Sequence, residues 1–199
     1  MADDGTMAAY AANIERYRRL VGEMGGNAML PRFLKRLPDK SSVLDFGCGV
    51  GDSAARIEAA GHDVTCIDAS PEMAATAKEF FGLDVRQQSF DELDDVAGFD
   101  AIWASFSLLH APKSAMPGIL ARIHRALRPG GLVYIGLKQG VGEYRDDFGR
   151  FYAYYEEAEL TGLVRTAGLS PIAIDHDETA GMSGKIEPCL HITSRKEEV

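Results

Sequence analysis

The chain has 199 residues, of which 46% are hydrophobic, 26% charged and 9% aromatic, with a formal net charge of −9. This composition is typical of a single globular domain with a full hydrophobic core, and it excludes a disordered chain, a collagen and a small disulfide scaffold. The acidic balance disfavours general nucleic-acid binding, because proteins of that class carry basic surfaces.

The first part of the chain is predicted to be helical. Residues 8–36 carry apolar side chains at helical spacing, and the stretch Gly25-Gly26-Asn27 divides them into two helices. We expect residues 1–38 to form a helical cap over the carboxyl edge of a core that occupies residues 40–199. Both parts are expected to belong to one domain, residues 1–199.

From residue 43 onward, short apolar strands alternate with helices. Strands are expected at 43–46, 64–67, 84–88, 99–105, 132–138, 171–175 and 189–193, and helices at 52–60, from Pro71 after a Ser70 cap, at 116–127 and at 156–167. Residues 139–149 are expected to be a loop, and residues 178–187 the loop of a final hairpin. The order predicts an α/β fold: a doubly wound, mostly parallel seven-stranded sheet with helices on both faces and an antiparallel last strand.

A glycine-rich turn, Gly47-Cys48-Gly49-Val50-Gly51, joins the first strand to a helix. Such a turn brings backbone N–H groups close to a ligand, since a Cβ would block the approach. Asp52 stands where a dinucleotide fingerprint has Gly or Ala, and Asp45 lies two residues before the first glycine. Both carboxylates would repel a pyrophosphate. Asp45 is instead suited to the ammonium end of S-adenosylmethionine, which has no phosphate.

A second acid, Asp68, ends the second strand 21 residues after Gly47. An acid at this place accepts hydrogen bonds from ribose hydroxyls in dinucleotide-binding folds, so it indicates an adenosine-type ligand without choosing the class. A helix-start acid is the competing interpretation.

Several segments together resemble the class I S-adenosylmethionine-dependent methyltransferases. Residues 43–51 resemble motif I of that family, 67–73 the post-I segment, 99–104 the fourth-strand motif and 127–131 the turn before the fifth strand. The resemblance covers residues 40–140 and is greatest to small bacterial members. It implies that S-adenosylmethionine donates a methyl group to an acceptor, most simply a small molecule, leaving S-adenosylhomocysteine.

The resemblance also implies a cofactor site. Asp45, Gly47 and Gly49 would hold the methionyl part, Asp68 the ribose, and Ala69 would pack beside the adenine. Ser89 and Phe90 would lie at the adenine edge, although the family often has Asp where Ser89 stands. Trp103 and Ala104 would pass beneath the methionine arm. The full expected set is Tyr10, Tyr17, Asp45, Phe46, Gly47, Cys48, Gly49, Asp68, Ala69, Met73, Ser89, Phe90, Trp103 and Ala104; helix packing is the alternative for the two tyrosines.

Acceptor contacts are expected from loops that follow the fourth and fifth strands. A methyltransferase must align the acceptor and exclude water, and it needs a general base only where the acceptor loses a proton. His110 is the candidate base, with a hydrogen bond to backbone as the competing interpretation. The expected acceptor-binding residues are His110, Lys138, Tyr144, Arg150 and Tyr152. Such residues suit an anionic or polar acceptor, because arginine pairs with carboxylates; a solvated loop is the alternative.

Two other functions remain open at this point: a nicotinamide (NAD)-dependent oxidoreductase, and a non-catalytic module that binds S-adenosylmethionine. No metal site is expected. No membrane partner is expected either, since no apolar run approaches the roughly 20 residues of a membrane span. Three cysteines, an odd count, favour the reducing cytoplasm. The protein is expected to be a monomer or a homodimer, with nucleic acid an unlikely partner.

Overall fold

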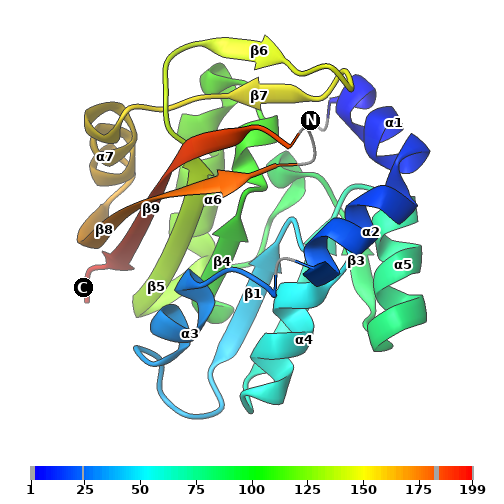
Figure 1. Ribbon diagram of the computed structural model, residues 1–199. Coiled ribbons are helices and arrows are strands. Elements are labelled where there is room, and N and C mark those ends of the chain that lie inside the picture. The colour runs from blue at the N-terminus through cyan, green and yellow to red at the C-terminus, as the bar shows by residue number, and fades with distance from the viewer. Residues whose placement is uncertain (1–2, 24, 182–183, 199) are drawn as a thin grey trace.

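The computed structural model describes residues 3–23, 25–181 and 184–198. Its centre is a seven-stranded sheet in the order β3-β2-β1-β4-β5-β9-β8 (Figure 1). The strands are β1 (Ser42–Phe46), β2 (Asp63–Asp68), β3 (Val85–Gln87), β4 (Phe99–Ser105), β5 (Leu127–Lys138), β8 (Leu169–Ala180) and β9 (Ile186–Lys196). Strands β1 to β5 pair in parallel, and β9 is antiparallel to both β5 and β8. The predicted sheet, with its antiparallel last strand, is confirmed.

Helices cover both faces of this sheet. One face packs against α6 (Met116–Ala126) and α7 (Glu157–Thr166), and the other against α3 (Met29–Leu34), α4 (Asp52–Ala59) and α5 (Pro71–Phe81). Alternation along β1 separates the two cores: Val43 belongs to one and Leu44 to the other. A strand buried on both sides has no polar face, which is why β1, β4 and β5 read as continuous apolar runs.

The N-terminal segment holds three helices where the sequence predicted two. Helix α1 (Asp4–Ala12) begins earlier than expected, because the Asp3 carboxylate accepts a hydrogen bond from the Thr6 N–H at 2.7 Å and caps it. Helix α2 (Ile14–Glu23) follows after a break at Asn13. The expected cap over the carboxyl edge corresponds to α1 and α2. Helix α3 packs instead on a face of the sheet, as part of the core.

Two differences concern hairpins. Part of residues 139–149, expected to be a loop, forms a two-stranded sheet from β6 (Glu143–Arg145) and β7 (Phe151–Ala153). The final hairpin is longer than predicted, since residues 178–180 pair with residues 186–188 rather than lying in its loop; residues 182–183 of that loop lie outside the described part of the chain. These strands are short or at an edge and carry polar side chains, so the apolar pattern does not mark them. Across the described residues, no helix has the length and apolar character to cross a membrane.

Candidate functional site

Two adjoining cavities open at the carboxyl ends of the parallel strands, where the strand order reverses between β1 and β4. In doubly wound sheets this is the place where ligands bind. The first cavity measures about 90 Å³ and the second about 370 Å³. Residues from α1, α2, the glycine turn and the end of β4 line both of them: Tyr10, Tyr17, Gly47, Ser105, Phe106 and His110.

The first cavity is built around Asp68 at the end of β2. Its carboxylate accepts the N–H of Gly49 and the N–H of Ser70, each at 2.8 Å, so the acid is fixed against the glycine turn. Burial raises the pKa of Asp68. The carboxylate has about four acceptor sites, so it can still accept a hydrogen bond from a ribose hydroxyl. The expected residues Ala69, Met73, Ser89 and Phe90 line this same cavity.

The glycine turn approaches its neighbours too closely for a side chain. Gly47 has a φ of +80°, and a Cβ there would lie 2.4 Å from the Cβ of Ser107. Ser107 cannot easily retreat, because its hydroxyl donates to the Phe46 carbonyl at 2.6 Å. A Cβ on Gly49, by contrast, would meet only the Tyr17 ring, at 3.6 Å or more. The steric need for a glycine is therefore at Gly47, whereas Gly49 lies in ordinary contact distance of Tyr17.

Asp45 is the buried acid of the second cavity. Within the described part of the chain, its Oδ2 atom has no hydrogen-bond partner. Burial, reinforced by the like charge of Asp68, raises the pKa of Asp45 to about 8. A buried carboxylate with an unpartnered oxygen is costly unless a donor or a cation reaches it. The ammonium group of S-adenosylmethionine fits this requirement.

His110 lies where the two cavities meet. Its Nδ1 atom is 2.7 Å from the carbonyl oxygen of Phe151, which can only accept, so Nδ1 carries the proton. The Nε2 lone pair then accepts the hydroxyl of Tyr10 at 2.8 Å. Burial lowers the pKa of His110 to about 4. The imidazole is thus bonded to backbone, and the residue lines both cavities; its role as a base stays a prediction.

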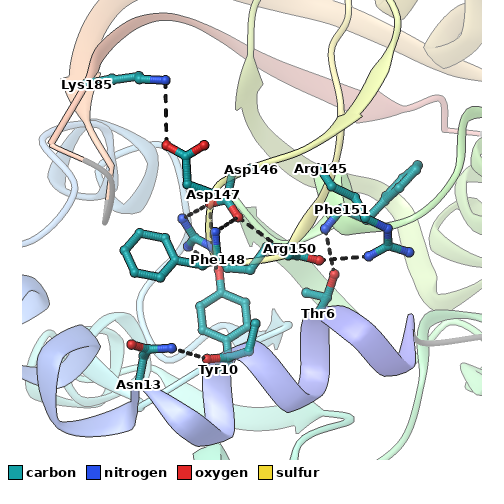
Figure 2. A network of polar contacts seen from close by, with 12 residues as sticks. Thr6, Tyr10, Asn13, Arg145, Asp146, Asp147, Phe148, Arg150, Phe151 and Lys185 are labelled. Carbon is teal, nitrogen blue, oxygen red and sulfur yellow. Dashed lines mark hydrogen bonds and ion pairs between the residues drawn. The ribbon is translucent and has the colours of Figure 1, made fainter.

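Three further expected residues, Lys138, Arg150 and Tyr152, line the second cavity. Arg150 is anchored by Asp146, whose Oδ2 accepts from Nε at 2.9 Å and from Nη2 at 2.6 Å. Its Nη1 donates to the Tyr10 hydroxyl at 3.3 Å. Figure 2 shows Arg150 and Asp146 above Tyr10, between the hairpin segment and α1. Lys138 forms an ion pair with Glu187.

Polar contacts tie α1 to the β6–β7 hairpin. Arg145 donates to both carboxylate oxygens of Asp3, at 2.9 and 2.7 Å. The Thr6 hydroxyl accepts the N–H of Phe151 at 2.8 Å (Figure 2). Helix α1, which carries Tyr10 over the site, is thus fastened at its N-terminal end to the element that positions Arg150.

Four expected site residues, all of them described, do not line either cavity. Phe46, Trp103 and Ala104 are fully buried in the two cores. The Trp103 ring stacks on Tyr134 at 3.8 Å, on the face that α3 covers. The Tyr144 side chain is 61% exposed on the hairpin. The family resemblance placed Phe46, Trp103 and Ala104 near the cofactor, and Tyr144 was expected near the acceptor. The alternating direction of strand side chains takes the rings of Phe46 and Trp103 into the cores instead.

The sequence analysis missed one chain of hydrogen bonds. Asn27 donates to the Ser105 hydroxyl at 2.9 Å and to the Tyr134 hydroxyl at 3.0 Å. Tyr134 contacts His191 Nδ1 at 2.7 Å, and His191 Nε2 contacts Asp177 at 2.8 Å. All of these except Tyr134 line the second cavity. No local motif marks them, since the chain joins segments that are far apart in sequence.

Comparison with known proteins agrees with this geometry. The model of a family described as a methyltransferase domain matches residues 43–131, which run from β1 through the glycine turn into β5. Over this segment the chain resembles the class I S-adenosylmethionine-dependent methyltransferases. The chain is 29% identical over 125 residues to an uncharacterized methyltransferase of Staphylococcus carnosus, a match that covers 62% of the chain and 60% of the relative.

Two solved structures extend the likeness. The 1,6-didemethyltoxoflavin-N1-methyltransferase of Burkholderia thailandensis, solved with 1,6-didemethyltoxoflavin and S-adenosylhomocysteine bound, is 27% identical, with a TM-score of 0.73 over 96% of this chain and 88% of that one. A Methanosarcina mazei methyltransferase shares the fold at 20% identity, with a TM-score of 0.75 over 85% of this chain and 98% of that one. Neither is an oxidoreductase. The chain spans less than two-thirds of the length of the first curated relatives it matches, 60% and 64%.

Proposed function

We propose that the protein transfers the methyl group of S-adenosylmethionine to a small-molecule acceptor. The observation that carries this proposal is the buried Asp45 carboxylate, which lies two residues before the first glycine of the turn. Its Oδ2 atom has no hydrogen-bond partner among the described residues. Bound there, S-adenosylmethionine supplies a methyl group activated by a positive sulfur. The likeness to a relative that holds a small heterocycle together with S-adenosylhomocysteine supports a small-molecule acceptor.

In this proposal the chain binds the cofactor with groups already in place. Asp68 accepts the ribose hydroxyls, and Asp45 pairs with the ammonium group. Phe90 and Ala69 flank the adenine from the end of β3 and β2. Tyr10 and Tyr17, from α1 and α2, cover the site and exclude water. Methyl transfer depends on alignment of the acceptor with the methyl group, and a closed, dry site maintains that alignment.

The second cavity holds the acceptor in this proposal. It meets the first cavity at His110, Ser105 and Phe106, so an acceptor placed there lies beside the methionyl end of the cofactor. His110 is neutral near pH 7, and its Nε2 lone pair takes the proton of an acceptor that must lose one. Lys138, Arg150 and Tyr152 orient the acceptor from the wall beside His110.

Calorimetric titration tests the cofactor assignment. Purified protein is titrated with S-adenosylmethionine, S-adenosylhomocysteine and both nicotinamide dinucleotides, and the series is repeated with Asp45→Ala. We expect the two sulfur ligands alone to bind, and the variant to lose S-adenosylmethionine. Binding of a dinucleotide with silent sulfur ligands would contradict the proposal. Transfer of a labelled methyl group to a panel of small acceptors then separates an enzyme from a non-catalytic binding module.

The cellular setting is part of the same proposal. Cys48, Cys66 and Cys189 are all free thiols, which supports a reducing compartment such as the cytoplasm. We propose that residues 1–199 work as one domain, as a monomer or a homodimer. The net charge of −9 supports a partner other than nucleic acid.

A further inference from the structure

Two buried cations in the second cavity point to the chemistry of the acceptor. Lys138 is 7% exposed and Arg150 is 3% exposed, and both line the cavity. They converge on one ring: the Lys138 ammonium lies 4.3 Å and the Arg150 guanidinium 5.1 Å from the centre of Tyr152. Buried lysine and arginine side chains are rare, and two of them at one ring form a local concentration of hydrogen-bond donors.

The carboxylates that neutralise these cations do not line the cavity. Asp146 holds Arg150, and Glu187 holds Lys138, and neither acid is among the residues of the cavity wall. Asp146 is itself fixed, because its Oδ1 accepts the N–H groups of Phe148 and Arg150, each at 3.0 Å. The guanidinium is therefore held in place before a ligand arrives, which lowers the entropic cost of binding one.

The cations keep donors to spare. The guanidinium has five N–H bonds, of which Asp146 and Tyr10 engage three within the described part of the chain. Of the three N–H bonds of the Lys138 ammonium, Glu187 engages one. A ligand group that only accepts hydrogen bonds, and that carries negative charge, satisfies such a surplus best. A carboxylate has this chemistry and pairs with arginine in two parallel bonds.

The rest of the cavity limits the shape and charge of the ligand. Its walls carry the aromatic rings of Tyr10, Tyr17, Phe106 and Tyr152, which suit a flat body. Across the sheet, Lys138 on β5 pairs with Cys189 on β9, and Cys189 pairs with Asp177 on β8. Asp177 thus lies two strand spacings, about 10 Å, from Lys138. Asp177 and its neighbour Glu178 both line the cavity, and these two acids disfavour a second negative group at that end.

We propose that the acceptor is a small aromatic monocarboxylate, whose carboxylate binds Arg150 and Lys138 beside Tyr152. The inference rests on the proposed function, since it names the substrate class of the same site. Its carboxylate end would lie near Tyr152, and its reacting end near His110, whose ring centre is 4.8 Å from that of Tyr152.

The test uses protein saturated with S-adenosylhomocysteine. It is titrated with benzoate, 4-hydroxybenzoate and 2-aminobenzoate, each beside its carboxamide, which has the same shape without the charge. We expect at least one carboxylate to bind about tenfold more tightly than its carboxamide. Arg150→Gln and Lys138→Gln should each reduce this ratio of dissociation constants by about tenfold, so that the carboxylate and the carboxamide bind about equally. Arg165→Gln, which changes an exposed arginine on α7, is the matched control and leaves the preference unchanged.

The outcomes separate the two proposals. If S-adenosylhomocysteine itself does not bind, the proposed function fails. If it binds, and no carboxylate is preferred over its carboxamide, or the preference survives both substitutions, the anionic acceptor is wrong. Because Arg150→Gln removes the partner of Asp146, thermal unfolding of each variant is measured first. Lys138→Gln decides the matter should Arg150→Gln fail to fold.

Discussion

The hydroxyl of Tyr10 and the Nε2 atom of His110, 100 residues apart in the chain, meet at 2.8 Å. Helix α1 thereby places a donor on the one lone pair that the imidazole offers to the cavities. An acceptor that gives its proton to His110 must take the place of this hydroxyl. The bond to Arg150 Nη1 at 3.3 Å gives Tyr10 a second partner, so its ring stays over the site after the exchange.

The protonation of His110 is directly measurable. Because burial lowers its pKa to about 4, we expect a neutral imidazole, with the proton on Nδ1, throughout pH 5 to 8. Nitrogen chemical shifts of the imidazole check this, with His110→Gln to assign the signal; an imidazolium signal at pH 6 would contradict it. In the unfolded chain the group takes up a proton near pH 6.5. The wild type should therefore lose stability as the pH falls from 6.5 to 4, and His110→Gln should lose less.

The fastening of α1 to the hairpin should control how long the cofactor stays. Asp3 and Arg145 form a two-bond ion pair that is partly exposed, and the Arg145 guanidinium lowers the pKa of Asp3. We expect Asp3→Asn and Arg145→Gln each to weaken S-adenosylhomocysteine binding by about two- to fivefold, since such pairs contribute up to about 1 kcal/mol. Stopped-flow displacement should show a faster dissociation rate.

The control for this prediction is Glu15→Gln, which breaks an exposed ion pair with Arg18 inside α2. That variant should bind as the wild type does. Arg145→Lys, which keeps a cation beside Asp3 and leaves the cap of α1 intact, should keep part of the residence time. An unchanged dissociation rate in Asp3→Asn would show that the ion pair does not hold the helix over the site.

The parallel part of the fold could be predicted because each strand is locally marked. The run Val43–Phe46 ends at a glycine turn, and the run Phe99–Ser105 begins after Gly98, so both ends are visible in the sequence. The β6–β7 hairpin carries no such marks: its first strand is Glu-Tyr-Arg, fully exposed, and it exists through pairing with β7 and contacts to α1. Contacts between distant segments leave no local pattern.

The site divides in the same way. Asp45, Gly47 and Asp68 could be predicted, since a turn after a strand fixes where they lie. The packing of Trp103 could not be predicted. Its ring contacts Phe33 and Tyr134, and nothing in the sequence around Trp103 shows that these two residues lie on the same face of the sheet. His191 carries no sequence signal of a site, although it lines the second cavity. Its partners Tyr134 and Asp177 are 57 and 14 residues away.

Cofactor affinity should depend on pH through Asp45. With a pKa of about 8 in the ligand-free protein, this carboxyl is protonated at pH 6 and must release its proton to pair with an ammonium group. S-adenosylhomocysteine should therefore bind more tightly as the pH rises from 5.5 to 7.5, by at most about tenfold per pH unit. Calorimetry in buffers of different ionisation enthalpy should detect the released proton.

Asp45→Asn tests the cause of that dependence. The variant should bind more weakly at pH 7.5 and show a flatter pH profile. The same substitution weakens cofactor binding but should stabilise the ligand-free protein at high pH, relative to the wild type. The raised pKa means that the wild type loses stability as the pH rises from about 4 through 8, whereas Asn carries no charge to lose. The melting temperature of the variant relative to wild type should increase between pH 6 and pH 9; a constant difference would exclude a buried, protonated Asp45.

The close approach at Gly47 predicts a graded set of alanine variants. Gly61, after α4, also has a positive φ, but a Cβ there would meet nothing within 4 Å. Gly61→Ala should therefore show the backbone cost alone, about 1–2 kcal/mol of unfolding free energy. Gly47→Ala adds a collision with Ser107, so its total should reach about 2–5 kcal/mol, with loss of S-adenosylhomocysteine binding.

Urea unfolding followed by fluorescence of Trp103, the single tryptophan, measures both variants. Combining Gly47→Ala with Ser107→Gly removes the colliding Cβ and should recover part of the lost stability, but not all of it, because the positive φ remains. If Gly47→Ala proves no more costly than Gly61→Ala, the turn has room beside Ser107.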